Sequence, residues 1–332
     1  MKKYFYLILL TSVIFSCNGR QKKIKFQGYA EGTYYAVTYF SKDGINYQNE
    51  IIKLLNDFEN SASIYRKNSL ISKINNNDTN IILDKTLNDI INKSIQISKE
   101  TNGAFDITVS PLVNAWGFGY TDTSTISKPL IDSLLNYVGY NKIHIINNKL
   151  LKDNKNIKLD LNAIAKGYSV DLVGNFLKSK GINNFIIDIG GEVKANGTKS
   201  QGKAWEIGIE KPCKTMYDDR EIKSKIILKD KAIATSGNYR KFYIKNGVKY
   251  SHTIDPKTGY PVSHSLLSAS VISDKCITAD AYATAFMVMG LEKAKLFIEK
   301  HQNIEAYFIY SDAKNNMKVY STKGFSKLLR EN

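Results

Sequence analysis

An aspartate and a threonine lie four residues apart in the stretch TADAYATAFMVMG, residues 278–290. Positions i and i+4 share one face of an α-helix, so Asp280 and Thr284 should point the same way. The small and apolar residues around them favour a buried helix. Because an unpaired buried carboxylate costs several kcal/mol, Asp280 needs a partner. The partner could be a cation or a set of backbone amides.

A second polar stretch, KLDLNAIAKGYSVDLV, occupies residues 158–173. We expect a strand to end near Asp160 and a helix to start one or two residues later. First-turn amides have no partner within the helix and the helix dipole favours anions, so a phosphate could bind there. Lys166, one turn into this helix, could reach the same anion. Alternatively, Asp160 is only the N-terminal cap of the helix.

Two further stretches contain glycines beside polar residues. In GAFDITVSP, residues 103–111, Asp106 follows a helix-ending glycine, and such an aspartate is often purely structural. In FIIDIGGEVKANG, residues 185–197, a buried strand ends at Gly190-Gly191, which permits a positive φ or the close approach of another group.

The remaining candidates lie near residues 236 and 252. In AIATSGNYRKFY, Ser236 and Gly237 offer a hydroxyl and backbone amides, with Arg240 and Lys241 nearby. In SHTIDPKTGYPVSHS, His252 precedes a tight Asp-Pro turn, where it could be an acid/base group or a phosphate contact. Alternatively, His252 is a satisfied structural residue.

The order of these motifs is more specific than any one of them. GTYY, SxYRKNS, GAFD, DLNAIAKGY, GGEVKANG, TSGNYR, HTIDPKTGYP and ADAYATA follow one another along the chain. In the order of these motifs the sequence resembles the ApbE family, the FAD:protein FMN transferases. The resemblance covers roughly residues 26–325 and implies a T-fold-like architecture.

The resemblance implies a magnesium site. Its ligands would be the side chains of Asp280 and Thr284 and the backbone carbonyl of Ala163. Mg²⁺ prefers oxygen ligands, keeps several waters and is commonly shared with substrate phosphates. The alternative is that backbone amides alone satisfy Asp280.

The resemblance also implies FAD contacts and departs from the family pattern at two positions. The implied contacts are Glu31, Tyr65, Ala104, Phe105, Asp106, Asp160, Lys166, Ser236, Gly237 and Ile254. At Glu31 a methionine commonly precedes Gly-Thr in the family, so this contact could use only the backbone. Asp188 stands where an asparagine is frequent.

The implied reaction is transfer of FMN from FAD to a threonine hydroxyl of an acceptor protein, with AMP as leaving group. His252 is the candidate for acid/base or positioning assistance. The implied acceptors are flavinylated proteins of membrane or secreted electron-transfer systems. Two alternatives remain: an FAD pyrophosphatase that uses water as acceptor, and a non-catalytic flavin-binding lipoprotein.

The elements that must position these residues belong to the α+β class, with mostly antiparallel sheets. Apolar spacing predicts helices at 47–60 and 86–100, and further helices are expected at 162–180, 278–290 and 291–301. Residues 26–40 are expected to form a strand pair or one long bent strand, and 143–160 contains two short β-like runs around an Asn-Asn turn. Further strands are expected at 184–189, 204–210, 224–229, 232–236, 241–254, 265–272, 305–310 and 316–320. The glycine-rich segment 117–129 is the best candidate for an exposed loop.

The 332-residue chain is strongly basic, with a formal net charge of +16. Its lysines are scattered among asparagines and isoleucines, and no zinc-finger spacing or RNA-binding signature is present, so we expect no nucleic-acid binding. Besides Cys17, only Cys213 and Cys276 are present. They could form one disulfide or remain as two thiols.

The N-terminus reads MKKYFYLILLTSVIFSC. Two lysines followed by a short apolar run predict a signal peptide at residues 1–16, too short for a membrane-spanning helix. The cysteine after Ile14-Phe15-Ser16 resembles a bacterial lipobox, so we expect a lipid anchor at Cys17 in the cell envelope. Residues 17–25 would be a tether and 26–325 the folded domain. The alternative is an ordinary signal cleaved elsewhere.

Overall fold

The computed structural model describes residues 21–118, 126–199, 202–212, 221–238, 242–245 and 248–330. The predicted signal peptide, Cys17, Cys213, Arg240 and Lys241 lie outside these ranges. In the described ranges no helix combines the length and the apolar character needed to cross a membrane.

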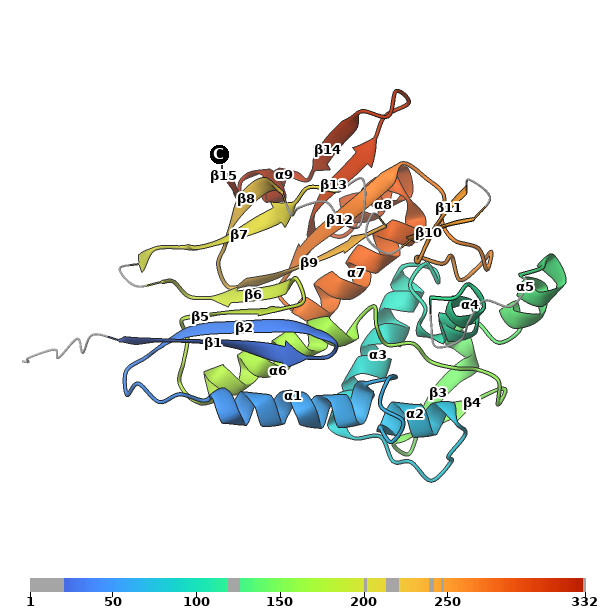
Figure 1. Ribbon diagram of the computed structural model, residues 1–332, viewed down its shortest axis with the longest axis horizontal. Coiled ribbons are helices and arrows are strands. Elements are labelled where there is room, and N and C mark those ends of the chain that lie inside the picture. Colours follow the sequence, from blue (N-terminus) through green and yellow to red (C-terminus); the bar gives the residue numbers. More distant parts are fainter. Residues whose placement is uncertain are drawn as a thin grey trace, which may run out of the picture.

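An eight-stranded antiparallel sheet forms the centre of the molecule (Figure 1). Along the sheet, its strands are β1 (Lys22–Ala30), β2 (Thr33–Ser41), β5 (Phe185–Ile189), β6 (Glu192–Asn196), β9 (Lys231–Gly237), β12 (Leu266–Ser273), β13 (Glu305–Ser311) and β14 (Met317–Ser321). Side chains alternate between its two faces. In β9, for example, Ala232 and Ala234 face one layer and Ile233 faces the other.

Helices cover one face of this sheet. α6 (Ala165–Ser179) and α7 (Cys276–Met289) pack against the strands and against each other, and α1 (Gln48–Ala62) packs beyond α6 (Figure 1). α3 (Lys85–Glu100) contacts α7 from the other side. The two cores that result are apolar.

A small three-stranded sheet covers the opposite face. It has the order β15 (Leu329–Arg330), β8 (Ile222–Leu228) and β7 (Trp205–Glu210). Trp205, Ile209, Ile226 and Leu228 pack with the large sheet in a third apolar core, which α9 (Lys323–Ser326) completes with Phe325. The architecture is thus three-layered, with helices, a large sheet and a small sheet.

Smaller elements surround the helical layer. They are α2 (Leu70–Asn75), α4 (Ser110–Ala115), α5 (Lys128–Leu135), α8 (Leu291–Glu299), the 3₁₀ turns Ile107–Val109 and Tyr140–Lys142, and the hairpins β3 (Ile143–Ile146) with β4 (Lys149–Lys152) and β10 (Phe242–Lys245) with β11 (Val248–Ser251). α4 and α5 form a separate small core with Trp116 and Ile254.

The α+β class with mostly antiparallel sheets is confirmed. Some boundaries were wrong. The segment 241–254 is not one strand but the β10–β11 hairpin followed by an irregular stretch, and α5 begins at Lys128, inside the predicted loop 117–129. β1 begins at Lys22, four residues before the predicted start of the domain. Cys276 is a buried free thiol.

Candidate functional site

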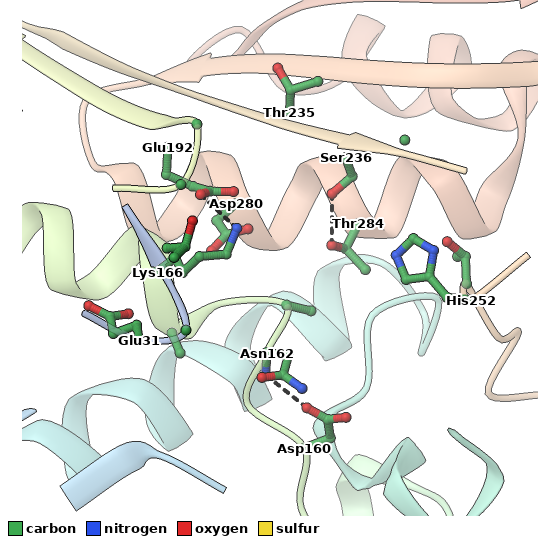
Figure 2. Close-up of a pocket in the computed structure, with 18 of the residues that line it drawn as sticks. Glu31, Asp160, Asn162, Lys166, Glu192, Thr235, Ser236, His252, Asp280 and Thr284 are labelled. Atoms are coloured by element: carbon green, nitrogen blue, oxygen red, sulfur yellow. Dashed lines mark hydrogen bonds and ion pairs between the residues drawn. The ribbon is translucent and has the colours of Figure 1, made fainter. Parts of the chain in front are cut away.

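A cavity of about 1140 Å³ opens where the helical layer, the large sheet and β7 meet. All fourteen residues that the sequence analysis assigned to a site line this cavity: Glu31, Tyr65, Ala104, Phe105, Asp106, Asp160, Ala163, Lys166, Ser236, Gly237, His252, Ile254, Asp280 and Thr284. Segments that lie up to 253 positions apart in the chain therefore meet at one place. Figure 2 draws 18 of the residues that line this cavity and labels ten of them.

Asp280 and Thr284 project from one face of α7, as their spacing predicted (Figure 2). Only 4% of Asp280 is exposed, and its Oδ2 accepts a hydrogen bond of 2.9 Å from the Gly167 N–H. The hydroxyls of Thr284 and Ser236 are 3.1 Å apart. One backbone amide thus contributes to satisfying Asp280, which leaves both interpretations of this carboxylate open.

Gly167 allows this contact because α6 and α7 approach closely there. A Cβ atom at position 167 would lie 2.5 Å from the carbonyl oxygen of Cys276 and 2.7 Å from the Cβ of Asp280. Any larger residue would push the two helices apart. The glycine in the motif DLNAIAKGY therefore sets the position of Asp280.

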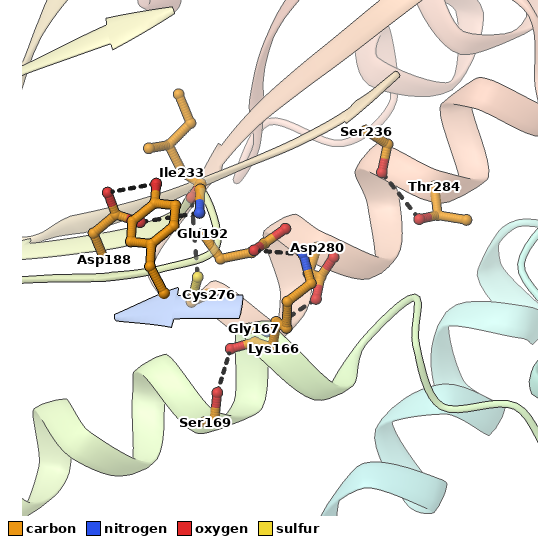
Figure 3. Close-up of polar contacts among 12 residues, drawn as sticks. Lys166, Gly167, Ser169, Asp188, Glu192, Ile233, Ser236, Cys276, Asp280 and Thr284 are labelled. Carbon is orange, nitrogen blue, oxygen red and sulfur yellow. Dashed lines mark hydrogen bonds and ion pairs between the residues drawn. The ribbon is translucent and has the colours of Figure 1, made fainter. Parts of the chain in front are cut away.

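Lys166 forms an ion pair with Glu192, with 2.7 Å between Nζ and Oε2 (Figure 3). Burial by itself lowers the pKa of Lys166, but the charges of Glu192 and Asp280 outweigh it, so the pKa lies above its ordinary value. Burial raises the pKa of Glu192 to about 8 and also raises that of Asp280. One ammonium group is shared by several buried carboxylates.

The segment before α6 differs from the prediction. α6 begins at Ala165, not one or two residues after Asp160, and Asp160 is not its N-cap. Instead, Oδ1 of Asp160 accepts from the Asn162 N–H at 2.8 Å, which closes a local turn. The side chain of Asn162 donates to the Tyr65 hydroxyl at 3.0 Å. Ala163 lies between this turn and the start of α6, and it lines the cavity.

Asp106 holds the loop that carries Ala104 and Phe105. Its Oδ1 accepts from the N–H and hydroxyl of Thr108, at 2.8 and 2.7 Å, and its Oδ2 accepts from the Tyr140 N–H at 2.7 Å. These contacts give Asp106 a structural role at the cavity wall. Burial raises its pKa, while the same hydrogen bonds oppose the shift.

Glu31 lies in the tight β1–β2 turn with a φ of +55°. Its N–H donates to Oε1 of Glu59 at 3.1 Å, and Glu59 in turn forms an ion pair with Arg66 at 2.5 Å. Among the described residues, no group donates a hydrogen bond to the buried Oε1 of Glu31. Burial raises the pKa of Glu31 to about 8. Burial thus outweighs the opposing effects of Ser169 and Lys166 and favours the protonated form of Glu31.

His252 lies on the Thr284 side of the cavity, away from Lys166 (Figure 2). Its ring packs edge-on against Phe118, with 6.3 Å between ring centroids. The turn after it is rigid, because Gly259 adopts a φ of +77° and donates to the Asp255 carbonyl at 2.8 Å. Trp116 Nε1 donates to the Gly259 carbonyl at 2.7 Å, which fixes the turn to α4.

The part of the cavity wall that the structure describes is rich in acidic residues although the chain is basic. In that part, Arg66 and Lys166 are the basic side chains besides His252, and the acidic ones are Glu31, Glu59, Asp106, Asp160, Asp188, Glu192, Glu206, Glu210 and Asp280. A diphosphate entering this cavity would need added positive charge. Among the described residues no group of three His, Cys, Asp or Glu could hold a metal ion. Asp280, Thr284 and Ala163, the magnesium ligands that the resemblance implies, all line this cavity and carry oxygen atoms, the ligand type that Mg²⁺ prefers.

The sequence analysis missed part of the wall. Glu59 gave no signal, because its contacts with the Glu31 N–H and with Arg66 form only in the folded chain. Glu192 did follow the Gly190-Gly191 pair, and its position at a predicted strand start was the available clue. Asp188 accepts hydrogen bonds from the Tyr34 hydroxyl at 3.2 Å and the Gly191 N–H at 2.9 Å (Figure 3). It therefore shapes the glycine turn.

Comparisons with known proteins agree on one family. The model of the ApbE family matches residues 31–308. The chain is 35% identical over 337 positions to a protein of Vibrio cholerae named FAD:protein FMN transferase, covering 98% of both chains. A Haemophilus influenzae protein of the same name is also 35% identical, with 99% of both chains covered. The structure resembles the flavin transferase ApbE from Vibrio cholerae, with a TM-score of 0.83, 34% identity and coverage of 93% and 99% of the two chains.

Proposed function

Because this chain belongs to the ApbE family, we propose that it transfers FMN from FAD to a threonine hydroxyl of an acceptor protein, with magnesium and release of AMP. The observation that carries the proposal is that fourteen residues, assigned to a site from the sequence alone, all line one cavity. The relatives' shared name supports flavin transfer as the reaction. We add to this the requirement for Mg²⁺, threonine as the acceptor residue and AMP as the leaving group.

In the proposed reaction the acceptor oxygen attacks the FMN-side phosphorus of FAD. A new oxygen–phosphorus bond forms, the pyrophosphate bond breaks, and AMP leaves with the bridging oxygen. The hydroxyl proton must go to a base or to water. Negative charge grows on the phosphoryl oxygens and the leaving phosphate, so cations and fixed positioning are the useful contributions.

This chain's residues fit those needs. Lys166 is held in the cationic form and can face a phosphate oxygen while Glu192 fixes its position. Asp280, Thr284 and a carbonyl at Ala163 would hold Mg²⁺, which when bound would offset charge on the diphosphate. To His252, which lies on the opposite side of the cavity from Lys166, we assign assistance in proton transfer or orientation.

The flavin contacts would come from the rest of the wall. Tyr65 is 64% exposed, so its ring is open to stacking by a planar group. The loop at Ala104–Asp106, the turn at Asp160, the residues Ser236 and Gly237, and Ile254 would enclose the remainder of FAD. Glu31 would contribute through its backbone, since its side chain differs from the methionine that the family commonly has at this position.

The test uses purified protein, FAD, MgCl₂ and membranes from source cells that lack the gene for this chain. We expect flavin fluorescence to appear on an acceptor band in a denaturing gel, with AMP released in equal amount. Asp280→Asn should abolish both while the circular-dichroism spectrum stays native. Activity near the wild-type level in metal-free protein would refute the magnesium proposal. FMN and AMP without labelled protein would identify a pyrophosphatase instead.

We also propose that the protein is anchored in the cell envelope by a lipid on Cys17 and faces acceptors of a membrane or secreted electron-transfer system. The support is the lipobox-like sequence after the predicted signal peptide. Location and acceptor are linked in this proposal, because an anchored transferase reaches acceptors at the same membrane.

A further inference from the structure

One part of the cavity wall has no role in the proposed chemistry. β7 contributes residues 206–210 to this wall, and none of them belongs to the proposed flavin or metal contacts. β7 is the edge strand of the three-stranded sheet, and in the described part of the chain its ladder runs only along β8. An exposed edge presents main-chain N–H and C=O groups that can pair with another extended chain.

The register shows which groups of β7 point outward. The Ile227 N–H donates to the Leu328 carbonyl at 2.9 Å, on the side of β8 that faces β15. Glu206 is opposite Ile227 in the antiparallel pair, so it occupies a non-hydrogen-bonded position. Its N–H and C=O therefore point away from β8, and alternation places those of Gly208 the same way.

The side chains of β7 leave this edge accessible. Ile209 is buried against the large sheet and Ile207 packs against the same core, whereas Glu206 and Gly208 are exposed. A glycine inside a strand often marks the close approach of another backbone. A contact within the sheet also favours glycine here, because a Cβ at position 208 would lie 2.5 Å from Cδ1 of Ile222. The ladder becomes irregular between Ile209 and Glu210, so the usable edge is residues 205–209.

The proposed reaction supplies the occupant. The acceptor hydroxyl must reach a cavity whose metal-binding carboxylate, Asp280, is only 4% exposed. An extended segment is the narrowest form of a polypeptide, and its alternate side chains project to one side. We propose that the edge of β7 binds an extended segment of the acceptor protein as an added strand, which directs the accepting hydroxyl into the cavity. This proposal rests on the proposed function.

The test replaces an outward-pointing amide. Proline lacks the N–H but is tolerated at edge positions that face away from the sheet. We expect Glu206→Pro to slow FMN transfer at least tenfold, with acceptor-containing membranes as the probe and in-gel flavin fluorescence as the readout. FAD affinity, measured by isothermal titration, should stay within twofold of wild type.

A matched control is available on β14, the edge strand at the far end of the large sheet. The Ser311 N–H donates to the Ser265 carbonyl, and Ser311 pairs with Met317, so the N–H of Val319 points outward by the same alternation. Val319 is 40% exposed and does not line the cavity. Val319→Pro should therefore leave transfer unchanged.

The outcomes separate the two proposals. If the wild-type enzyme labels no protein, the proposed function fails. If it labels the acceptor and Glu206→Pro does so within twofold, strand addition is refuted. If Glu206→Ala loses as much transfer activity as Glu206→Pro, the carboxylate is responsible and strand addition is likewise refuted. Should Glu206→Pro melt early, hydrogen exchange of the wild-type enzyme with detergent-solubilised acceptor decides: slower exchange across 205–209 supports the proposal, and unchanged exchange overturns it.

Discussion

Among single residues, Lys166 carries the ammonium group that several buried carboxyl groups of the site share. It is 2.7 Å from Glu192 and also interacts with Asp280 and Glu31. One ammonium group cannot offset three half-buried or buried carboxylates, so burial keeps the pKa of each carboxyl raised. A divalent cation beside Asp280 would favour its ionised form. The acidic wall is thus a reason for a metal-dependent site.

His252 should matter more for turnover than for binding. Losing a general acid/base typically costs ~10²–10⁴-fold in rate, so His252→Ala is expected to transfer FMN far more slowly with little change in FAD affinity. Single-turnover transfer and isothermal titration with FAD, run on one preparation, measure the two effects.

Other results would assign His252 differently. A lower melting temperature with near-normal activity per folded molecule would indicate a structural residue, consistent with its packing on Phe118. Normal turnover with weakened FAD affinity would make it a ligand contact. Transfer within about twofold of wild type would contradict the catalytic role, since the expected loss is far larger.

Glu31 should make stability depend on pH. The folded protein holds its proton with a pKa of about 8, against an ordinary value of 4.5. As pH rises through this window the unfolded chain releases the proton first, so the folded state loses stability until about pH 8. Glu31→Gln should therefore melt several degrees higher than wild type at pH 8.5, and near the wild-type temperature at pH 5.

Thermal unfolding of FAD-free protein at both pH values measures this difference. Glu299→Gln is a suitable control, because it removes one exposed carboxylate of α8 and leaves the cavity intact. A melting difference for Glu31→Gln that is the same at pH 5 and 8.5 would show that Glu31 titrates normally.

At the scale of elements, the contact between α6 and α7 connects the two halves of the proposed site. α6 carries Lys166 near its start and α7 carries Asp280 and Thr284. Gly167 brings the helices together, since its N–H reaches the Asp280 carboxylate. A shift between these helices would therefore separate the cationic side chain from the proposed metal ligands.

Gly167→Ala should be destabilising and reduce transfer. The added methyl would overlap the Cys276 carbonyl, and overpacking of this kind costs typically about 1–3 kcal/mol. Gly174→Ala, on the same helix, is the matched control, because its Cβ would lie 3.3 Å from its nearest neighbour, a side-chain methylene of Lys194, rather than 2.5 Å from a backbone oxygen. There the higher helix propensity of alanine should leave stability equal or improved. Denaturant unfolding compares the two, and equal stability would contradict the close-packing argument.

Sequence patterns predicted the strongly periodic elements well. α1 and α3 lie where apolar spacing placed them, because each has one face buried in an apolar core. α7 lies where its small and apolar residues placed it, because it is buried on nearly all sides. The start of α6 was wrong because the Asp160 side chain closes a turn with Asn162 that spacing does not reveal. Segment 241–254 was predicted as one strand because the Asn246-Gly247 pair, a strong hairpin signal between β10 and β11, was not used.

The candidate site was predictable where one short motif carries the chemistry. Asp280 with Thr284, and Lys166, were found from spacing and motif order. Glu192 was missed because its role depends on Lys166, 26 positions away and on another element. β7 was predicted as a strand, but its place at the cavity edge follows from sheet order, which no local pattern encodes.

At the scale of the whole molecule, the three layers explain how one cavity collects so much of the chain. The large sheet separates the helices from the small sheet, and the cavity extends from α7 to β7. The helical side would hold FAD and the metal, while the β7 edge would receive the acceptor. Donor and acceptor thus reach the same site from different layers.

The proposed anchor would place this assembly close to a membrane. β1 begins at Lys22, so at most roughly 18 Å of extended chain separates it from Cys17. Removing residues 1–16 takes away two lysines, and the mature formal charge of +14 would favour an anionic lipid surface. We expect a radioactive fatty acid fed to cells to label the protein. Cys17→Ser should release it or leave an uncut precursor, because the lipid and the cleavage both depend on the cysteine. An unlabelled wild-type protein in the soluble fraction would contradict the anchor, and the acceptor would then have to be sought away from the membrane.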